Sequence, residues 1–180
     1  MANKKALPLV GDRRVVDRML RVDHAGEYGA QRIYAGQLSV LGETELGDIL
    51  RHMAAQEDVH LATFEKMLPP ERVRPTALLP LWHVLGYAMG AGTAKLGREA
   101  AMACTVAVEE VIVEHYAKQI EELGADRPDI SRVLKKFKAE EDEHREIGLD
   151  HDAELAPRYR LLRAAIRAAS KTAIWISERV

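Results

Sequence analysis

Two Glu-x-x-His motifs are the parts of this sequence whose residue types and spacing best support chemistry. They run from Glu57 to His60 and from Glu141 to His144. Residues three positions apart share one face of a helix, so the carboxylate and the imidazole of each motif can bind one metal ion together. Salt bridging on a solvated surface is the alternative interpretation of such pairs.

Two more glutamates extend these motifs into a repeated pattern. Glu27 and Glu109 each lie on the apolar face of the helical segment that precedes a motif. Glu27 and Glu57 are equidistant from Gly42, and Glu109 and Glu141 are equidistant from position 125, so a turn at each midpoint brings each pair level. An unpartnered buried carboxylate is costly, so the pattern predicts a compensating positive charge in the core.

The pattern predicts a site for two metal ions. Its expected ligands are Glu27, Glu57, His60, Glu109, Glu141 and His144. Four carboxylates balance two divalent ions, and oxygen with imidazole ligands suits iron or manganese. The second nitrogen of each histidine needs an acceptor, for which Asp23 is a candidate, with a solvent-facing position as the alternative. Because Cys104 is the only cysteine, an all-cysteine cluster is excluded.

Other polar residues near these positions are weaker candidates. On a helix Glu110 is turned about 100° away from the apolar face of Glu109. Glu140 and Glu143 are expected on a solvated face, and His115 is expected to be a core or outer-sphere histidine. Tyr116 is a candidate for a redox or hydrogen-bonding role, and the alternative is a core tyrosine.

Helices must position these residues, because helix formers dominate and alternating β-branched runs are lacking. Helical periodicity covers five segments, at about 13–41, 44–68, from before 102 to 123, 128–155 and from 157 to the C-terminus. The second is expected to stop at Pro69. We therefore expect one domain over residues 1–180, an all-α, ferritin-like four-helix bundle made of two long-helix hairpins.

Two segments are left outside the four bundle helices. Residues 75–94 contain no Asp, Glu, Lys or Arg. A buried crossover, or an interfacial helix on a membrane, is favoured there over a transmembrane span. The C-terminal segment predicts a basic amphipathic helix, which either packs on the bundle or meets anionic lipid headgroups. The basic face consists of Arg160, Arg163, Arg167 and Lys171.

Charge and the N-terminal sequence limit the class of protein. The net charge of -2 argues against nucleic acid as a partner. The beginning, MANKKALPLVGDRR, lacks the apolar region of a signal peptide and an Arg/Ser-rich presequence. A prokaryotic protein on the cytoplasmic side, or a mature form, is expected.

Several blocks of sequence resemble the demethoxyubiquinone hydroxylases of ubiquinone biosynthesis. They are DHAGEYGA, MAAQEDVH, CTVAVEEVIVEHY, KAEEDEHREIGLDHDAELAP and the terminal IWISERV. The likeness runs from about Val16 to the C-terminus, and all six expected ligands match the iron ligands of that family. It implies a di-iron monooxygenase with two iron ions per chain. The implied reaction adds one hydroxyl group to the benzoquinone ring of a demethoxy-ubiquinone precursor, using O2 and two electrons, with NADH as the expected reductant.

The resemblance also implies partners and a location. The substrate is a polyprenylated quinone, so a membrane surface is an expected partner, and other ubiquinone-biosynthesis proteins are candidates. Attachment is expected to be peripheral or monotopic, on the cytoplasmic side of a bacterial inner membrane. The rival interpretations are a ferritin-like iron-binding or ferroxidase protein, a manganese catalase or peroxide-reducing relative, and a metal-free helical bundle.

Overall fold

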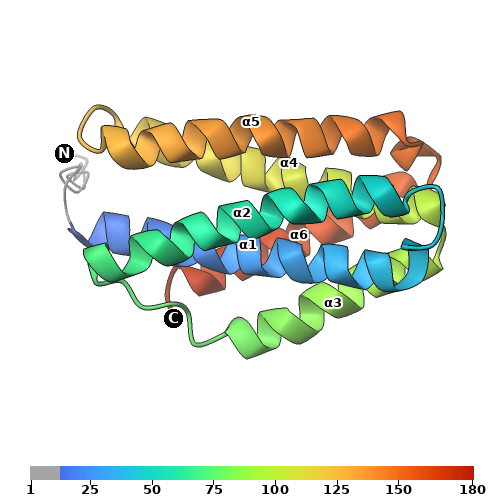
Figure 1. Ribbon diagram of the computed structural model, residues 1–180, viewed down its shortest axis with the longest axis horizontal. Helices are drawn as coiled ribbons and strands as arrows, with labels where there is room; N and C mark the ends of the chain where they lie inside the picture. Colours follow the sequence, from blue (N-terminus) through green and yellow to red (C-terminus); the bar gives the residue numbers. More distant parts are fainter. Residues whose placement is uncertain (1–12) are drawn as a thin grey trace, which may run out of the picture.

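The computed structural model describes residues 13–180, and over this range the chain forms helices and no strand (Figure 1). The expectation of an all-α protein is therefore confirmed for these residues. The N-terminal residues 1–12, to which much of the signal-peptide prediction applies, lie outside the described range. The elements are α1 (Arg13–Leu41), α2 (Gly47–Glu71), α3 (Leu79–Lys95), α4 (Arg98–Leu123), α5 (Pro128–Asp150), the short 3-10 helix η1 (Ala153–Leu155) and α6 (Tyr159–Ser177).

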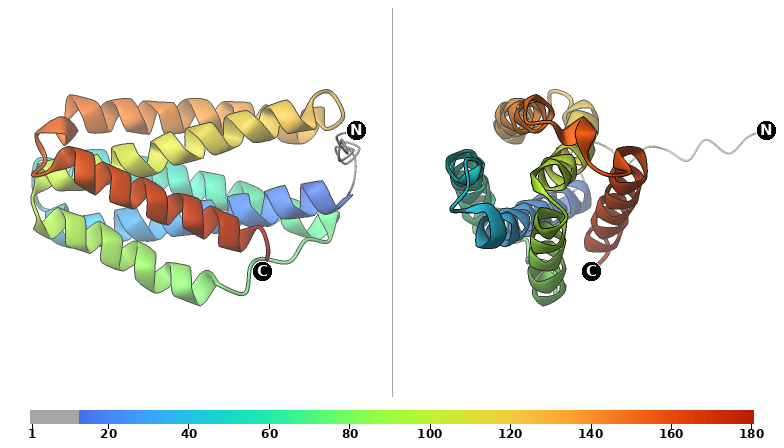
Figure 2. Two further views of the ribbon diagram at one scale, coloured as in Figure 1. Left: turned by 180° about the vertical axis from the view of Figure 1, so that it is seen from behind. Right: turned by 90° about the vertical axis from the view of Figure 1, so that its right-hand side faces the viewer.

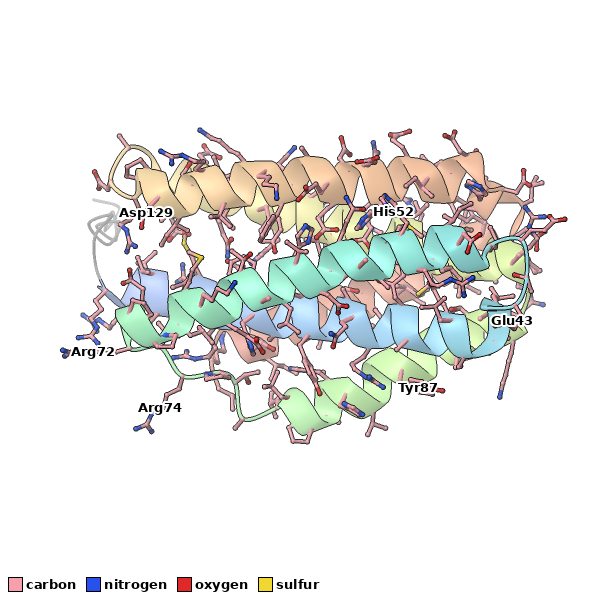
Figure 3. All side chains as sticks on the ribbon, in the orientation of Figure 1. Glu43, His52, Arg72, Arg74, Tyr87 and Asp129 are labelled. Carbon is pink, nitrogen blue, oxygen red and sulfur yellow. The ribbon has the colours of Figure 1, made fainter. Side chains whose placement is uncertain are left out.

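The four long helices pack as two hairpins, α1 with α2 and α4 with α5. In the first turn the guanidinium of Arg51 donates to the carbonyl oxygen of Gly42 at 2.9 Å. At the other end of the bundle Arg127 joins the hairpins, because it donates to Glu71 at the end of α2 and to Asp129 at the start of α5. Figure 3 labels Asp129 and Arg72 at this shared end.

Two apolar clusters fill the space between the long helices, one on each side of the predicted ligands along every helix. One cluster includes Phe64 and Phe137. The other includes Tyr34, Met53 and Met102. The level of the bundle that holds the motifs is therefore enclosed by buried apolar layers.

The uncharged segment forms α3, which lies directly against the backbone of α1. A Cβ atom on Gly90 would stand 2.0 Å from the carbonyl oxygen of Ile33, so only glycine allows this approach. Because small residues make the contact, large side chains of α3 remain outside, and Val84 is 62% exposed. Among residues 13–180 no helix has the combination of length and apolar content that crossing a membrane requires.

The basic side of α6 packs on α4. Arg163 and Arg167 both donate to Glu110, at 2.7 Å and 2.6 Å, and Arg167 and Lys171 contact Glu114 at 2.6 Å and 3.1 Å. The basic face was expected either to pack on the bundle or to meet lipid headgroups, and Arg163, Arg167 and Lys171 pack on the bundle. Figure 2 shows α3 and α6 on the side of the molecule away from α2 and α5.

Three helix ends differ from the sequence prediction. The helix expected to end at Pro69 continues to Glu71, because the amides of Arg72 and Val73 close its end by donating to the carbonyl oxygens of Pro69 and Leu68. The helix expected over residues 128–155 is α5, which ends at Asp150 and is followed by the short helix η1. The last helix begins at Tyr159, two residues after the proline expected to start it.

Candidate metal centre

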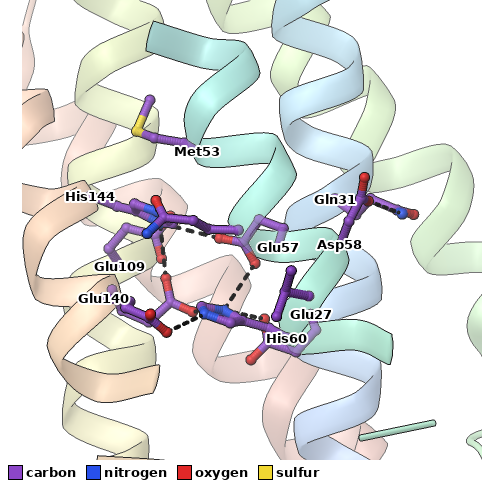
Figure 4. Close-up of polar contacts among 12 residues, drawn as sticks. Glu27, Gln31, Met53, Glu57, Asp58, His60, Glu109, Glu140 and His144 are labelled. Carbon is purple, nitrogen blue, oxygen red and sulfur yellow. Dashed lines mark hydrogen bonds and ion pairs between the residues drawn. The ribbon is translucent and has the colours of Figure 1, made fainter. Parts of the chain in front are cut away.

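All six predicted ligands converge in the middle of the bundle, from four different helices (Figure 4). One carboxylate comes from α1 and one from α4, whereas α2 and α5 each contribute a whole Glu-x-x-His motif. Each of the six side chains is at most 1% exposed. The surface salt bridges considered as an alternative for these motifs are therefore excluded by burial.

The donor atoms form two overlapping groups, and within each group all of them lie within 4.8 Å of one another. The first group contains Glu27, Glu57, His60 and Glu141, and the second contains Glu57, Glu109, Glu141 and His144. Glu57 and Glu141 belong to both groups. Glu27 and Glu109 each belong to one group only, so each group could hold one ion and the glutamates of the two motifs are common to both.

Both histidines turn Nδ1 toward the carboxylates. Glu141 lies between them, with one oxygen 3.1 Å from Nδ1 of His60 and the other 3.1 Å from Nδ1 of His144. Glu57 approaches His144 at 3.2 Å, and Glu27 approaches His60 at 3.5 Å. A single imidazole nitrogen on each side therefore faces the centre of the site.

The far nitrogens of the histidines have partners that the sequence analysis did not choose. Nε2 of His60 lies 3.0 Å from Glu140, and Nε2 of His144 lies 2.9 Å from Gln56. The expectation of a solvated Glu140 was wrong, since its carboxylate contacts a buried ring. The signal that could have found both partners is their position immediately before the glutamate of a motif.

Asp23, the acceptor proposed from the sequence, has a different neighbourhood. It accepts a hydrogen bond from Gln119 at 2.8 Å and lies 3.4 Å from Nε2 of His115. Burial raises the pKa of this carboxyl group despite the nearby imidazole. The prediction that Asp23 binds a ligand histidine was therefore wrong, and so was its solvent-facing alternative, because the side chain is buried.

Ionisation of the cluster is strongly perturbed. Burial, reinforced by the charge of Glu141, raises the pKa of Glu27, Glu57 and Glu109. Burial also opposes ionisation of Glu141, but hydrogen bonds with His144 and His60 hold its pKa at about 2. Burial disfavours a charged His60, yet hydrogen bonds with Glu141 and Glu27 raise its pKa to about 10. Without a cation, protons must compensate part of the negative charge.

Unpaired oxygen atoms show that the site suits divalent cations. Both carboxylate oxygens of Glu57, and one oxygen each of Glu27 and Glu109, are buried without a hydrogen-bond partner. Leaving such atoms unpaired is costly, and two divalent ions would supply both the ligands' missing partners and the missing charge. Hard oxygen atoms with imidazole match the preferences of iron and manganese.

Two tyrosines contact the carboxylates that face one ion each. The hydroxyl of Tyr34 donates to Glu109 at 2.9 Å, and the hydroxyl of Tyr116 donates to Glu27. Burial, with the nearby glutamates, raises the pKa of both phenols well above the ordinary range. The contact of Tyr116 with Glu27 agrees with the hydrogen-bonding role considered for it from the sequence. Tyr34 is not among the residues singled out from the sequence, because nothing in its local pattern marks it as a partner of Glu109.

An apolar pocket of about 340 Å³ reaches the site from the side of α3 and α6. Its wall is formed by side chains such as Ile33, Met89, Ile112 and Ile174. Its polar end contains Asp23, Glu27, His115 and Tyr116. A hydrogen bond of 3.0 Å from Trp82 of α3 to Ser177 of α6 closes one edge. The arrangement can admit a flat apolar molecule to one side of the carboxylate cluster.

Comparison with known proteins gives consistent matches over nearly the whole chain. A family model described as ubiquinone biosynthesis protein COQ7 matches residues 14–177. A human protein named NADPH-dependent 3-demethoxyubiquinone 3-hydroxylase, mitochondrial, is 56% identical over 172 residues, which cover 93% of this chain and 79% of the relative. The 3-demethoxyubiquinol 3-hydroxylase of Rhodospirillum rubrum is 55% identical over 167 residues, 92% of this chain and 79% of the relative. The 5-demethoxyubiquinone hydroxylase of Saccharomyces cerevisiae is 40% identical over an alignment of 182 positions that covers 92% of this chain and 78% of the relative.

Proposed function

Because the chain belongs to the family of ubiquinone biosynthesis protein COQ7, we propose that it is an oxidoreductase that hydroxylates a demethoxyubiquinone-type substrate with O2. The observation that carries this proposal is the contact between the buried Glu/His cluster and an apolar pocket, which share Glu27. A pocket lined by aliphatic side chains suits a quinone better than it suits hydrated iron, which a storage protein must admit.

In this proposal the cluster is a di-iron centre in a ferritin-like bundle. The six converging side chains would hold two iron ions, and Glu57 and Glu141 belong to both groups of candidate ligands. When bound, two iron ions supply the redox chemistry that activates O2. The two apolar core clusters exclude water from the reaction. Tyr34 and Tyr116 orient the carboxylates of Glu109 and Glu27 and keep a proton at each phenol oxygen.

The pocket binds the quinone ring at its polar end, and the polyprenyl tail leaves between α3 and α6. His115 and Tyr116 line this end of the pocket, where the oxygen substituents of the ring would lie. The electrons come from a reduced nicotinamide nucleotide. The family resemblance implies NADH, whereas the name of the human relative specifies NADPH, so the two nucleotides are to be compared as reductants with one preparation of the protein.

We further propose that the enzyme docks peripherally on the inner membrane through apolar side chains beside the pocket. Val84 and Leu85 of α3 and Trp175 of α6 are 62%, 49% and 57% exposed. Most of the basic face of α6 is already paired with α4, so apolar contact supplies the larger part of the attraction.

A liposome flotation assay tests the docking surface. Val84→Glu is expected to keep the protein out of the floating fraction, because it puts a charge where acyl chains would lie. Val59→Glu is the matched control, since Val59 is 53% exposed on α2, away from α3 and α6. Equal flotation of both variants and the wild type would argue against this surface.

The activity itself is tested by reducing the iron-loaded protein without air and then adding O2 labelled with ¹⁸O and a short-chain demethoxyquinone. Mass spectrometry is expected to find one labelled oxygen atom in the product. Oxygen consumption without a hydroxylated quinone would favour the ferroxidase alternative. Glu109→Ala is expected to abolish the product, whereas Glu143→Ala, at an exposed position of α5, is expected to retain it.

A further inference from the structure

The far nitrogens of the two ligand histidines are held by a crossed pair of hydrogen bonds between α2 and α5. Glu140 stands immediately before the glutamate of one motif and binds His60 of the other, at 3.0 Å. Gln56 stands immediately before Glu57 and binds His144 of the other motif, at 2.9 Å. The same position of each motif thus holds the histidine of the opposite helix.

Each bond determines which nitrogen the ring offers to the site. An imidazole that binds a cation through Nδ1 must carry its proton on Nε2, where it needs an acceptor. Glu140 accepts that proton's hydrogen bond from His60, and the Oε1 atom of Gln56 accepts the one from His144. Both rings are thereby oriented with Nδ1 toward Glu141.

The two acceptors differ in charge although their positions correspond. Glu140 is a carboxylate whose other oxygen lies 3.5 Å from the ammonium group of Lys136, and Gln56 is a neutral amide. A hydrogen bond to a carboxylate is stronger than one to an amide and makes the imidazole a better electron donor to a metal. Apart from this difference the two subsites have the same ligand types, one histidine, one unshared glutamate and two shared glutamates.

We propose that Glu140 and Gln56 are positioning residues that make the two metal subsites unequal. The subsite of Glu27 and His60 binds its ion first and more tightly, and the subsite of Glu109 and His144 binds the second ion more weakly. This proposal rests on the proposed two-ion centre and adds an order of occupation to it.

Anaerobic titration of the metal-free full chain with Co²⁺ tests the proposal, because the visible absorption of Co²⁺ reports each binding step. The wild type is expected to bind two ions with clearly different dissociation constants. Glu140→Gln is expected to weaken the tighter step by about 10–100-fold and leave the weaker step unchanged. Gln56→Glu is expected to lower the dissociation constant of the weaker step, which brings it closer to the constant of the tighter step.

Controls assign each step to a subsite and separate local effects from general ones. Glu27→Ala is expected to remove the tight step, and Glu109→Ala the weak one. Glu143→Gln alters an exposed acid on the same helix and is expected to leave both constants unchanged. Circular dichroism of the metal-free variants verifies their folding, and Gln56→Glu decides the question independently of how Glu140→Gln folds.

The outcomes separate this proposal from the one on which it rests. If the wild type binds no Co²⁺ in the core, the metal centre itself is wrong. If it binds two ions with equal constants, or if Glu140→Gln lowers both steps equally, the centre stands and the inequality is overturned. Wild-type constants in both Glu140→Gln and Gln56→Glu would likewise overturn the positioning roles.

Discussion

At the scale of single residues, the cluster is built from groups that are costly to bury alone and are satisfied only together. Glu57 has no hydrogen-bond donor for either oxygen, whereas Glu109 has one oxygen satisfied by Tyr34. These hydrogen bonds hold the carboxylates in place whether or not a cation is bound. The stability of the metal-free protein should therefore respond to each donor that is removed.

Tyr34→Phe tests this expectation, because it leaves a buried oxygen of Glu109 without its donor. The free energy of unfolding of the metal-free protein is expected to fall by about 1–3 kcal/mol, measured by urea denaturation. Tyr28→Phe is the matched control, because its hydroxyl contacts His83 near the surface, and its effect is expected to be smaller. Equal losses in the two variants would show that the buried hydrogen bond has no special weight.

The raised pKa values of the buried glutamates predict how stability depends on pH. Burial raises the pKa of Glu57 well above its ordinary value of 4.5, so the folded metal-free protein favours the protonated acid. That contribution is complete below pH 4.5 and is lost as pH rises toward the raised pKa. His60, with its pKa raised to about 10, acts in the same direction.

A bound cation removes this penalty, since it stabilises the ionised carboxylates and the neutral imidazoles. The difference in melting temperature between the metal-loaded and the metal-free protein is therefore expected to widen between about pH 5 and about pH 8. Calorimetry in buffers of constant ionic strength measures it. A difference that stays constant or narrows over this range contradicts the assigned pKa shifts.

At the scale of elements, glycine determines how closely α3 approaches α1. Gly36 and Gly90 are both in backbone contact with the opposite helix, because a Cβ atom would stand 2.3 Å and 2.0 Å from its carbonyl oxygens. This close approach forms one wall of the apolar pocket and leaves the large side chains of α3 exposed. A side chain at either position must move α3.

Gly90→Ala is expected to lower the free energy of unfolding by about 1–3 kcal/mol, because the added methyl group meets the rigid backbone of α1. Gly92→Ala is the matched control in the same helix, where a Cβ atom meets nothing within 4 Å. There alanine is expected to be neutral or to stabilise by up to about 1 kcal/mol through its helix propensity. Thermal and urea unfolding of the pair measure the contrast, and losses of equal size would contradict it.

At the scale of the whole molecule, α6 turns a bundle of two hairpins into a protein with a covered pocket. Its cations are anchored on Glu110 and Glu114, and its other side supplies Ala169, Ala173 and Ile174 to the pocket wall. The buried Glu/His cluster lies within the bundle itself. A mutation in α6 should therefore be able to block access to the Glu/His cluster without changing the cluster itself.

Ala173→Phe is expected to fill the pocket and lower kcat/KM for the quinone by about tenfold or more, while the iron content stays at two ions per chain. Ala168→Phe changes an exposed position of the same helix and is expected to leave both properties unchanged. Elemental analysis and turnover of one preparation measure them. Loss of iron in Ala173→Phe would instead indicate damage to the bundle.

The sequence by itself indicated the long helices and the six side chains that the structure brings together, because both depend largely on local spacing. A period of 3.6 residues defines helices, and Glu and His three positions apart must share a face whatever the tertiary structure. The equal distances of Glu27 and Glu57 from Gly42 also follow from numbering alone. Local rules were less reliable at helix ends, where Pro69 lies inside α2 because tertiary packing and the following turn compensate for the lost hydrogen bond.

Only the tertiary structure decided which side chains complete the site and what can reach it. Glu140 and Gln56 contact histidines 80 and 88 positions away in the sequence, and Tyr34 meets Glu109 from another hairpin. The pocket arises because α3 and α6 lie beside α1 and α4. The basic face of α6 is paired because Arg163 and Arg167 contact Glu110 of α4. Such contacts depend on how the helices pack, and helical periodicity alone does not specify which polar residue of one helix meets which residue of another.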